Sequence, residues 1–237
     1  MTDIATYDDG AARRAVIETG RRMNSAGINQ GTSGNVSLRN PGGFLVTPTS
    51  LPYDRMEPDD VVQMGFDGSY EGRRRPSSEW RFHRDILDGR RDVEAVLHCH
   101  SVYATTLACL DRPIPAFHYM VGVAGGTTIR CAPYATFGTQ ALSDAAIAAL
   151  DGRLACLLGH HGQISLGRDL DGALALAVEV ETLARLYVQT LAVGEPTVLP
   201  DDEMARVLEQ MRLMSYGRAP DLVGVEDAAR PRLRGAP

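Results

Sequence analysis

The run Val93-Glu94-Ala95-Val96-Leu97-His98-Cys99-His100 decides how the rest of this 237-residue chain is interpreted. It is a short apolar stretch typical of a buried strand, and it ends in two histidines. Because residues two apart on a strand point to the same face, we expect His98 and His100 on one face and Cys99 on the other. Two imidazoles on one rigid edge are a natural pair of metal ligands. The alternative is a structural core histidine beside a surface histidine, since this spacing alone is a weak motif.

The composition excludes several classes of function. Hydrophobic residues make up 44% of the chain, enough for one sizeable core, and a formal net charge of -6 disfavours a nucleic-acid partner. The longest apolar run is too short to cross a membrane. Four scattered cysteines without a C-x-x-C pair are typical of reduced thiols, and residues 1–10 are polar and acidic, unlike a signal peptide. A cytoplasmic protein is therefore expected.

The sequence contains no lysine, because all 24 of its basic side chains are arginines. This excludes an enzyme amine that forms a Schiff base, an anchor for pyridoxal phosphate and the lysine of a phosphate-binding loop. Any electrophilic stabilisation must therefore come from arginine, from backbone amides or from a metal ion.

Hydrophobic patterns along the chain predict strands mixed with helices. Helices are predicted at residues 11–23, 76–87, 102–110, 141–150, 169–191 and 201–214. Strands are predicted at residues 36–38, 44–47, 61–66, 93–100, 114–123 and 154–166, the last as one continuous strand. Serine is the expected N-cap of the helix at residues 76–87. The mixture predicts an α/β sandwich, without deciding the direction of the strands.

The histidines cluster in the middle of the chain, between His83 and His161. His160 and His161 lie at the end of a second buried segment, so one of these two can reach the cleft of the first pair. Three imidazoles with an open fourth position describe a catalytic zinc site. The nearest carboxylate is that of Glu79, at a predicted helix start and on the same helical face as His83. Taken alone, such a pair is more often a capping or surface pair.

Two segments of small residues can bind an anion. The Gly-Thr-Ser-Gly-Asn loop at residues 31–35 can present several backbone N–H groups in a concave arrangement. Ser77 and Ser78 lie at a predicted helix N-terminus, where the helix dipole favours negative charge. Each signal is weak separately, because serine caps many helices. With a metal site and no lysine, they suggest a phosphate group held by amides and hydroxyls.

A series of motifs carries a resemblance to a known family. In chain order they are NQGTSGNVS (29–37), TPT (47–49), PSSEWRFH (76–83), HCH (98–100), IPAFHYM (114–120), CAPYATFGT (131–139) and HHG (160–162). Together they resemble the class II aldolase/adducin family over residues 11–216, and most of all its members that act on L-fuculose 1-phosphate. The resemblance implies a single-domain α/β/α sandwich with a central mixed, mainly antiparallel sheet flanked by helices. The domain is expected at residues 1–216, followed by a mobile C-terminal tail at residues 217–237.

The resemblance also implies the site residues. The metal ligands would be Glu79, His98, His100 and His161, holding one Zn²⁺ per subunit or another divalent metal. The catalytic residues would be Glu79 and Tyr119, the tyrosine supplied by a neighbouring subunit of a ring-shaped homotetramer with active sites at its interfaces. Relatives carry glycine at the position of Ser50. The phosphate and substrate contacts would be Gly34, Asn35, Thr49, Ser50, Ser77, Ser78, Phe137 and Tyr216.

The implied reaction is the reversible cleavage of a ketose 1-phosphate, a small sugar phosphate, to dihydroxyacetone phosphate and an aldehyde through a metal-stabilised enediolate. L-fuculose 1-phosphate and the 5-deoxy or 5-methylthio derivatives of ribulose 1-phosphate all fit this scheme. Glu79 would shuttle the C3 proton, and Tyr119 would act at the aldehyde oxygen. The alternatives within the family are 4-epimerases, which carry aspartate in place of Glu79, and sugar-acid phosphate decarboxylases. From another class, adducin-like heads are binding modules without zinc ligands.

Overall fold

The computed structural model describes residues 9–214, so the predictions for Tyr216 and for the tail at residues 217–237 lie outside the described residues. The described part contains one eight-stranded sheet in the order β4-β3-β2-β1-β5-β8-β7-β6. Every neighbouring pair is antiparallel except β6 and β7, which confirms the predicted mixed, mainly antiparallel sheet. The strands are β1 (Asn35–Asn40), β2 (Gly43–Val46), β3 (Val62–Met64), β4 (Tyr70–Glu71), β5 (Ala95–Cys99), β6 (Arg130–Ala132), β7 (Ala155–Leu158) and β8 (Gly162–Gly167).

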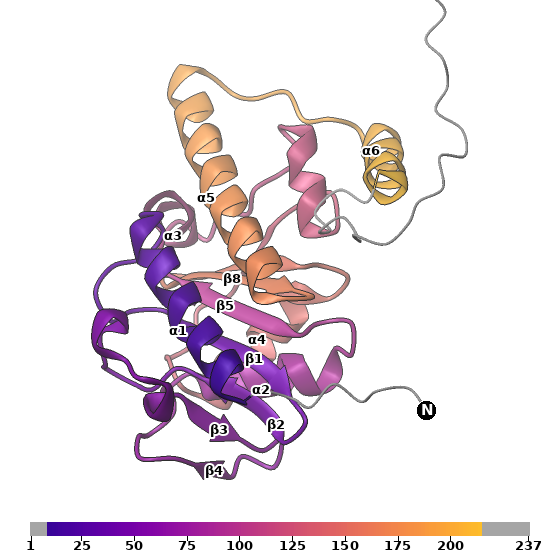
Figure 1. Cartoon of the computed structure of the whole chain (residues 1–237). Coiled ribbons are helices and arrows are strands. Elements are labelled where there is room, and N and C mark those ends of the chain that lie inside the picture. The colour runs from indigo at the N-terminus through magenta and orange to yellow at the C-terminus, as the bar shows by residue number, and fades with distance from the viewer. Residues whose placement is uncertain (1–8, 215–237) are drawn as a thin grey trace, which may run out of the picture.

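Helices cover both faces of this sheet, as Figure 1 shows. They are α1 (Asp9–Ser25), α2 (Trp80–Gly89), α3 (Val102–Ala108), α4 (Gln140–Leu150), α5 (Leu170–Val193) and α6 (Asp201–Leu213), with the 3₁₀ helices η1 (Tyr53–Arg55), η2 (Pro58–Asp60) and η3 (Tyr119–Ala124). One face packs against α2 and α4, and the other against α1, α3 and α5. The predicted α/β/α sandwich is therefore confirmed. None of the helices within residues 9–214 is long and apolar enough to cross a membrane.

Strand β5 lies in the interior of the sheet, between β1 and β8. All of its residues are buried, which explains why its sequence is apolar on both faces. Val96 packs into the core under α2 and α4, whereas Leu97 and Cys99 pack into the core under α1 and α5. The alternation expected from the sequence therefore holds, and Cys99 faces away from the side of His98. Since β5 ends at Cys99, His100 is the first residue after the end of the strand.

The prediction of a strand at residues 114–123 was wrong. Ile114 forms only an isolated bridge with Ile129, and η3 begins a few residues later. The His118 ring accepts a hydrogen bond from the backbone N–H of Met120 at 3.2 Å and so caps η3. The apolar character of this segment reflects burial under α5 rather than strand pairing, because it belongs to the core that α5 covers.

The predicted continuous strand at residues 154–166 is a hairpin instead. Strands β7 and β8 pair antiparallel, with Leu158 opposite Gly162. His160 takes a left-handed conformation, with φ at 54°, and this tight turn reverses the chain. The predicted serine cap of α2 was also wrong, because Glu79 occupies the N-cap position and its side chain makes no capping hydrogen bond. Its carboxylate is therefore free to point elsewhere.

Candidate active site

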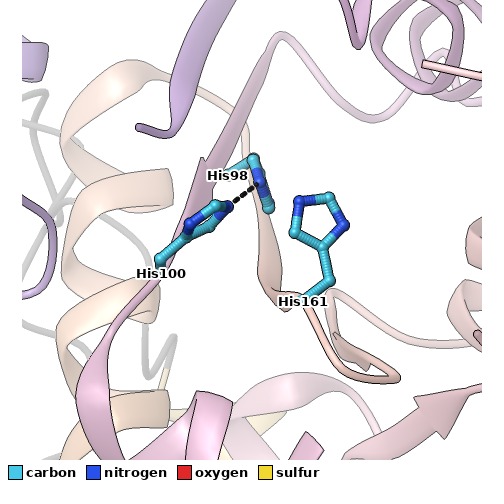
Figure 2. Close-up of side chains that lie close together, drawn as sticks. All are labelled: His98, His100 and His161. Atoms are coloured by element: carbon cyan, nitrogen blue, oxygen red, sulfur yellow. Dashed lines mark hydrogen bonds between the residues drawn. The ribbon is translucent and has the colours of Figure 1, made fainter. Parts of the chain in front are cut away.

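Three histidines converge at the ends of adjacent strands of the sheet. His98 and His100 come from the end of β5, and His161 comes from the turn between β7 and β8. Figure 2 shows their rings turned toward one another. One ring nitrogen of each lies within 4.8 Å of the others. The Nε2 atoms of His98 and His100 are 3.0 Å apart. His160 does not join this group, since its Nε2 lies 3.7 Å from Oδ2 of Asp111.

Glycines allow the backbone to close tightly around this cluster. Gly34 precedes β1 with φ at 74°, and a Cβ on it would lie 2.6 Å from the carbonyl oxygen of His98. Gly162 follows His161, and its Cβ would lie 2.5 Å from the carbonyl oxygen of Cys99. Any larger residue at either position would push apart the segments that carry the histidines.

The carboxylate of Glu79 completes the cluster from the opposite side. Its Oε2 lies 3.2 Å from Nε2 of His98, and its Oε1 lies 3.3 Å from Nε2 of His161. Glu79 is only 6% exposed, and its Oε1 is a buried atom without a hydrogen-bond partner among the described residues. The four ligands expected from the resemblance are thus brought together by the fold, although they come from three separate parts of the sequence.

Hydrogen bonding determines which nitrogen of His98 is available. Its Nδ1 lies 2.8 Å from the backbone carbonyl oxygen of Gln163. A carbonyl oxygen can only accept, so Nδ1 carries a proton, and Nε2 is the nitrogen that faces the cluster. A backbone carbonyl that holds the distal ring nitrogen is the usual second partner of a metal-binding histidine.

The ionisation states of the cluster follow from its burial and its charges. Burial, together with the nearby His98, lowers the pKa of His100 and of His161 to about 4, so both rings are neutral at pH 7. Burial acts to raise the pKa of Glu79, but His98, His161 and Asn35 outweigh it and hold that pKa below its usual value. The cluster therefore presents the neutral imidazoles of His100 and His161 beside one ionised carboxylate.

This donor set fits a divalent cation. Nε2 of His98 faces Oε2 of Glu79 at 3.2 Å. The buried Oε1 of Glu79 has no donor among the described residues. A cation between these atoms satisfies the orphaned oxygen. Three imidazole nitrogens and one carboxylate oxygen are donors that zinc accepts, and imidazole also suits other transition metals.

A pocket of about 390 Å³ opens next to the cluster. Glu79, His100 and His161 line it, together with an aromatic group formed by Tyr134, Phe137 and His160. No arginine among residues 9–214 lines this pocket, so the anion-binding groups that the structure describes there are hydroxyls and amides. The hydroxyl-bearing and loop residues that line it are Thr32, Ser33, Gly34, Asn35, Thr49, Ser50, Ser77 and Ser78.

Backbone pairing brings the hydroxyls of two distant segments into this pocket. The Thr49 N–H donates to the Arg75 carbonyl at 3.2 Å, and the Ser77 N–H donates to the Thr47 carbonyl at 3.0 Å. Ser50 follows in the left-handed region with φ at 58°, where its hydroxyl lies 3.4 Å from that of Thr49. The two segments thus form one wall rich in hydroxyl groups.

Residues 14–188 match the family described as Class II Aldolase and Adducin N-terminal domain. The chain belongs to the class II aldolase/adducin family. It is 53% identical over 207 residues to the 5-methylthioribulose-1-phosphate/5-deoxyribulose-1-phosphate aldolase of Rhodospirillum rubrum, covering 87% of this chain and 93% of that one. It is also 48% identical over 205 residues to the L-fuculose phosphate aldolase of Escherichia coli strain K12, covering 86% of this chain and 94% of that one.

The solved structures agree with this membership. An L-fuculose 1-phosphate aldolase superposes with a TM-score of 0.83 at 38% identity, covering 85% of this chain and 96% of the other. The predicted family, the predicted fold and the predicted enzyme class, an aldolase of class II among the lyases, are therefore confirmed.

The pocket of this class II aldolase includes residues to which the sequence assigned no contact, and it omits Tyr119, which was expected in the site of a neighbouring subunit. Tyr119, on η3, is 48% exposed and does not line the pocket of its own chain. Tyr134 and His160 do line it, although sequence reasoning gave Tyr134 no role and considered His160 only as an alternative to His161 for the third ligand. Their signal was present, because each belongs to a motif that carries the family resemblance. Phe137 lines the pocket as expected.

Proposed function

We propose that this class II aldolase cleaves a ketose 1-phosphate to dihydroxyacetone phosphate and an aldehyde, with Zn²⁺ as its cofactor. The ligands would be His98, His100, His161 and Glu79. The observation that carries the proposal is the orphaned Oε1 of Glu79 beside three converging histidines and a hydroxyl-lined pocket. A divalent cation supplies Lewis-acid stabilisation of the negative charge that develops beside a carbonyl. The absence of lysine supports this route, because a Schiff base has no amine to form on.

The substrate phosphate is assigned to the hydroxyl-rich wall of the pocket. Thr49, Ser50, Ser77 and Ser78 offer hydroxyl donors there, and Gly34 permits close approach of the backbone. Binding energy from this group holds the sugar in register and so contributes to orientation at the reacting carbons. Asn35 lines the same pocket, but its assignment to the phosphate stays a prediction, since Nδ2 of its amide donates to Glu79.

Proton transfer is assigned to two groups of the chain. The ionised carboxylate of Glu79 transfers the C3 proton, and the Tyr119 hydroxyl transfers the proton at the aldehyde oxygen. Burial of Glu79 keeps bulk water away from its carboxylate. Because Tyr119 does not line the pocket of its own chain, we assign it to the site of a neighbouring subunit in a homotetramer.

A complementation experiment tests the shared site. Glu79→Gln and Tyr119→Phe subunits, each inactive alone, are co-expressed with different tags and the mixed assemblies are purified. In a ring with shared sites, each site takes Glu79 from one subunit and Tyr119 from its neighbour. Each of these two groups is native with a chance of about one half in randomly mixed tetramers, so about a quarter of the sites regain both. Activity that stays at the level of the parent variants in mixed assemblies would place both groups in one chain and overturn the shared site.

The reaction is tested with three substrates. Purified enzyme is incubated with L-fuculose 1-phosphate, 5-deoxyribulose 1-phosphate and 5-methylthioribulose 1-phosphate, and dihydroxyacetone phosphate is detected by NADH oxidation through glycerol-phosphate dehydrogenase. The proposal expects turnover of at least one sugar, lost with a chelator and restored by Zn²⁺. Release of carbon dioxide from sugar-acid phosphates, or formation of a 4-epimer alone, would favour a decarboxylase or an epimerase instead. Metal analysis that finds no bound divalent ion would contradict the cofactor.

A further inference from the structure

A chain of buried hydrogen bonds extends from Glu79 into the core. Asn35 Nδ2 lies 3.0 Å from Glu79 Oε2, and Asn35 Oδ1 lies 2.5 Å from His83 Nε2. The other ring nitrogen of His83, Nδ1, lies 2.6 Å from the hydroxyl oxygen of Ser37. Ser37 and His83 are fully buried, and Asn35 is 4% exposed. Asn35 and Ser37 are two residues apart on β1, so they share a face of the sheet, and α2 carries His83 against that face.

The chemistry of these groups determines the direction of every bond in the chain. The ionised carboxylate of Glu79 can only accept, so the amide of Asn35 must present its NH₂ group there. The Asn35 oxygen then faces His83 and needs a donor, which places the proton of the neutral ring on Nε2. Nδ1 of His83 is left as an acceptor, and Ser37 donates its hydroxyl proton to it. All three donors therefore point toward Glu79.

We propose that Ser37, His83 and Asn35 form a positioning chain that holds the carboxylate of Glu79 in its metal-binding orientation. The proposal rests on the proposed function, in which Glu79 is a ligand. Without the bond from Asn35, the carboxylate could rotate about its terminal torsion, whose preference is broad. With Oε2 held, Oε1 is left without a partner and directed at the histidine cluster. Aligned hydrogen bonds also polarise one another and strengthen the last bond of the series.

The ring of His83 is itself fixed by packing. The Phe82 ring lies 4.6 Å from it, centroid to centroid, at an interplanar angle of 30°. His83 is therefore a positioning residue that acts through Asn35, not a ligand and not a group that touches the substrate. A purely structural role for the same polar cluster predicts lower stability on mutation but an unchanged metal site, and this difference makes the proposal testable.

The first test compares two substitutions of His83. His83→Phe keeps a ring but removes both nitrogens, whereas His83→Gln places an amide N–H near the position of Nε2 and an oxygen that can accept from Ser37. Metal-free enzyme is titrated with Zn²⁺ by competition against a chromogenic chelator, and the visible spectrum is recorded with Co²⁺. We expect His83→Phe to weaken Zn²⁺ affinity by about 10–100-fold, the usual effect of losing such an outer partner, and to alter the Co²⁺ spectrum. His83→Gln should restore most of both.

The second test uses matched serine substitutions, which remove only one hydroxyl and leave the fold intact. Ser37→Ala removes the far end of the chain. Ser143→Ala is the control, because Ser143 is also fully buried and donates its hydroxyl to Asp85 at 2.6 Å, on the helix layer formed by α2 and α4. Both variants lose one buried hydrogen bond and should lose similar thermal stability. Only Ser37→Ala is expected to weaken Zn²⁺ binding and to change the Co²⁺ spectrum.

The outcomes separate this inference from the proposed function. Wild-type Zn²⁺ affinity and an unchanged Co²⁺ spectrum in both His83→Phe and Ser37→Ala, with lower melting temperatures, would leave only a structural role and overturn the positioning chain. Should His83→Phe fail to fold, Ser37→Ala and His83→Gln decide the question. If the wild-type chain itself binds no Zn²⁺, the proposed function fails, and the positioning chain fails with it.

Discussion

Replacement of Glu79 by glutamine should lower the turnover number severely while leaving the metal-free fold intact. The substitution keeps the size of the side chain and removes its charge. The amide oxygen can still accept from Asn35 Nδ2, which donates to Oε2 at 3.0 Å in the native chain. The new NH₂ group then takes the position of Oε1, 3.3 Å from Nε2 of His161, where it can donate to a ring nitrogen. An acceptor without a partner is thus replaced by a donor with one.

The magnitude of this effect follows from the role assigned to Glu79. Proton transfer by a positioned side chain contributes about 10²–10⁴-fold to the rate. At about 1.36 kcal/mol for each factor of ten, the barrier should rise by about 2.7–5.4 kcal/mol. The KM for the sugar phosphate should change little, because the hydroxyls of Ser77 and Ser78 are untouched. The metal-free variant should melt below the metal-free wild type, because a carboxylate whose pKa is held below its usual value stabilises the fold at pH 7, and glutamine removes that charge.

The assay couples dihydroxyacetone phosphate to NADH oxidation at saturating Zn²⁺, so that weaker metal binding does not limit the rate. Calorimetry on chelator-treated protein gives the two melting temperatures. A turnover number within tenfold of the wild type would refute the assignment of proton transfer to Glu79. A metal-free variant that melts at or above the wild-type temperature would refute the argument that the ionised carboxylate stabilises the metal-free fold.

Three further perturbations test other parts of the molecule. With free Zn²⁺ at about a thousand times its Kd, removal of the metal should lower the free energy of unfolding by about 4 kcal/mol. The melting temperature should then fall by roughly 8–16 °C, measured by calorimetry with and without chelator. Ser50→Gly should raise the free energy of unfolding by about 1–2 kcal/mol, because serine is left-handed here with φ at 58°. The same variant should raise KM by roughly 10-fold through the loss of one hydroxyl contact to the phosphate. A lower melting temperature would contradict the expected gain in stability. Burial acts to raise the pKa of Asp60, but hydrogen bonds from Arg74 and Arg73 lower it from 3.8 to about 2. The ionised carboxylate of Asp60 therefore stabilises the fold above pH 3.8, and this contribution is lost as the pH falls toward 2. Asp60→Asn should lower the free energy of unfolding, measured by urea titration, clearly at pH 7 and far less at pH 2.

Local sequence was sufficient for the features that depend on near neighbours. The alternation at residues 93–100 predicted a buried strand with Cys99 on the face opposite His98, because side-chain direction in a strand repeats every two residues. The long helices at residues 169–191 and 201–214 were found within a few residues of their bounds for the same reason. The absence of lysine restricted the chemistry before any geometry was known.

Apolar character alone misled where tertiary contacts decide the backbone. Residues 114–123 resemble a strand because they are buried, but burial under α5 does not require a sheet partner. The HHG motif looked like part of one strand, yet antiparallel pairing of β7 with β8 folds it into a turn. The left-handed conformation of His160 is what turns its ring away and leaves His161 beside the cluster.

The composition of this chain by itself determined that no lysine amine stabilises negative charge, which leaves arginine, backbone amides or a metal ion. Only the tertiary structure decided which oxygen of Glu79 is left unpaired and which residues hold the other one. The bond from Asn35 to Glu79 spans 44 residues, and the contact of His83 with Asn35 spans 48. Such contacts depend on strand register and on helix docking against the sheet, and neither leaves a periodic signal in the sequence.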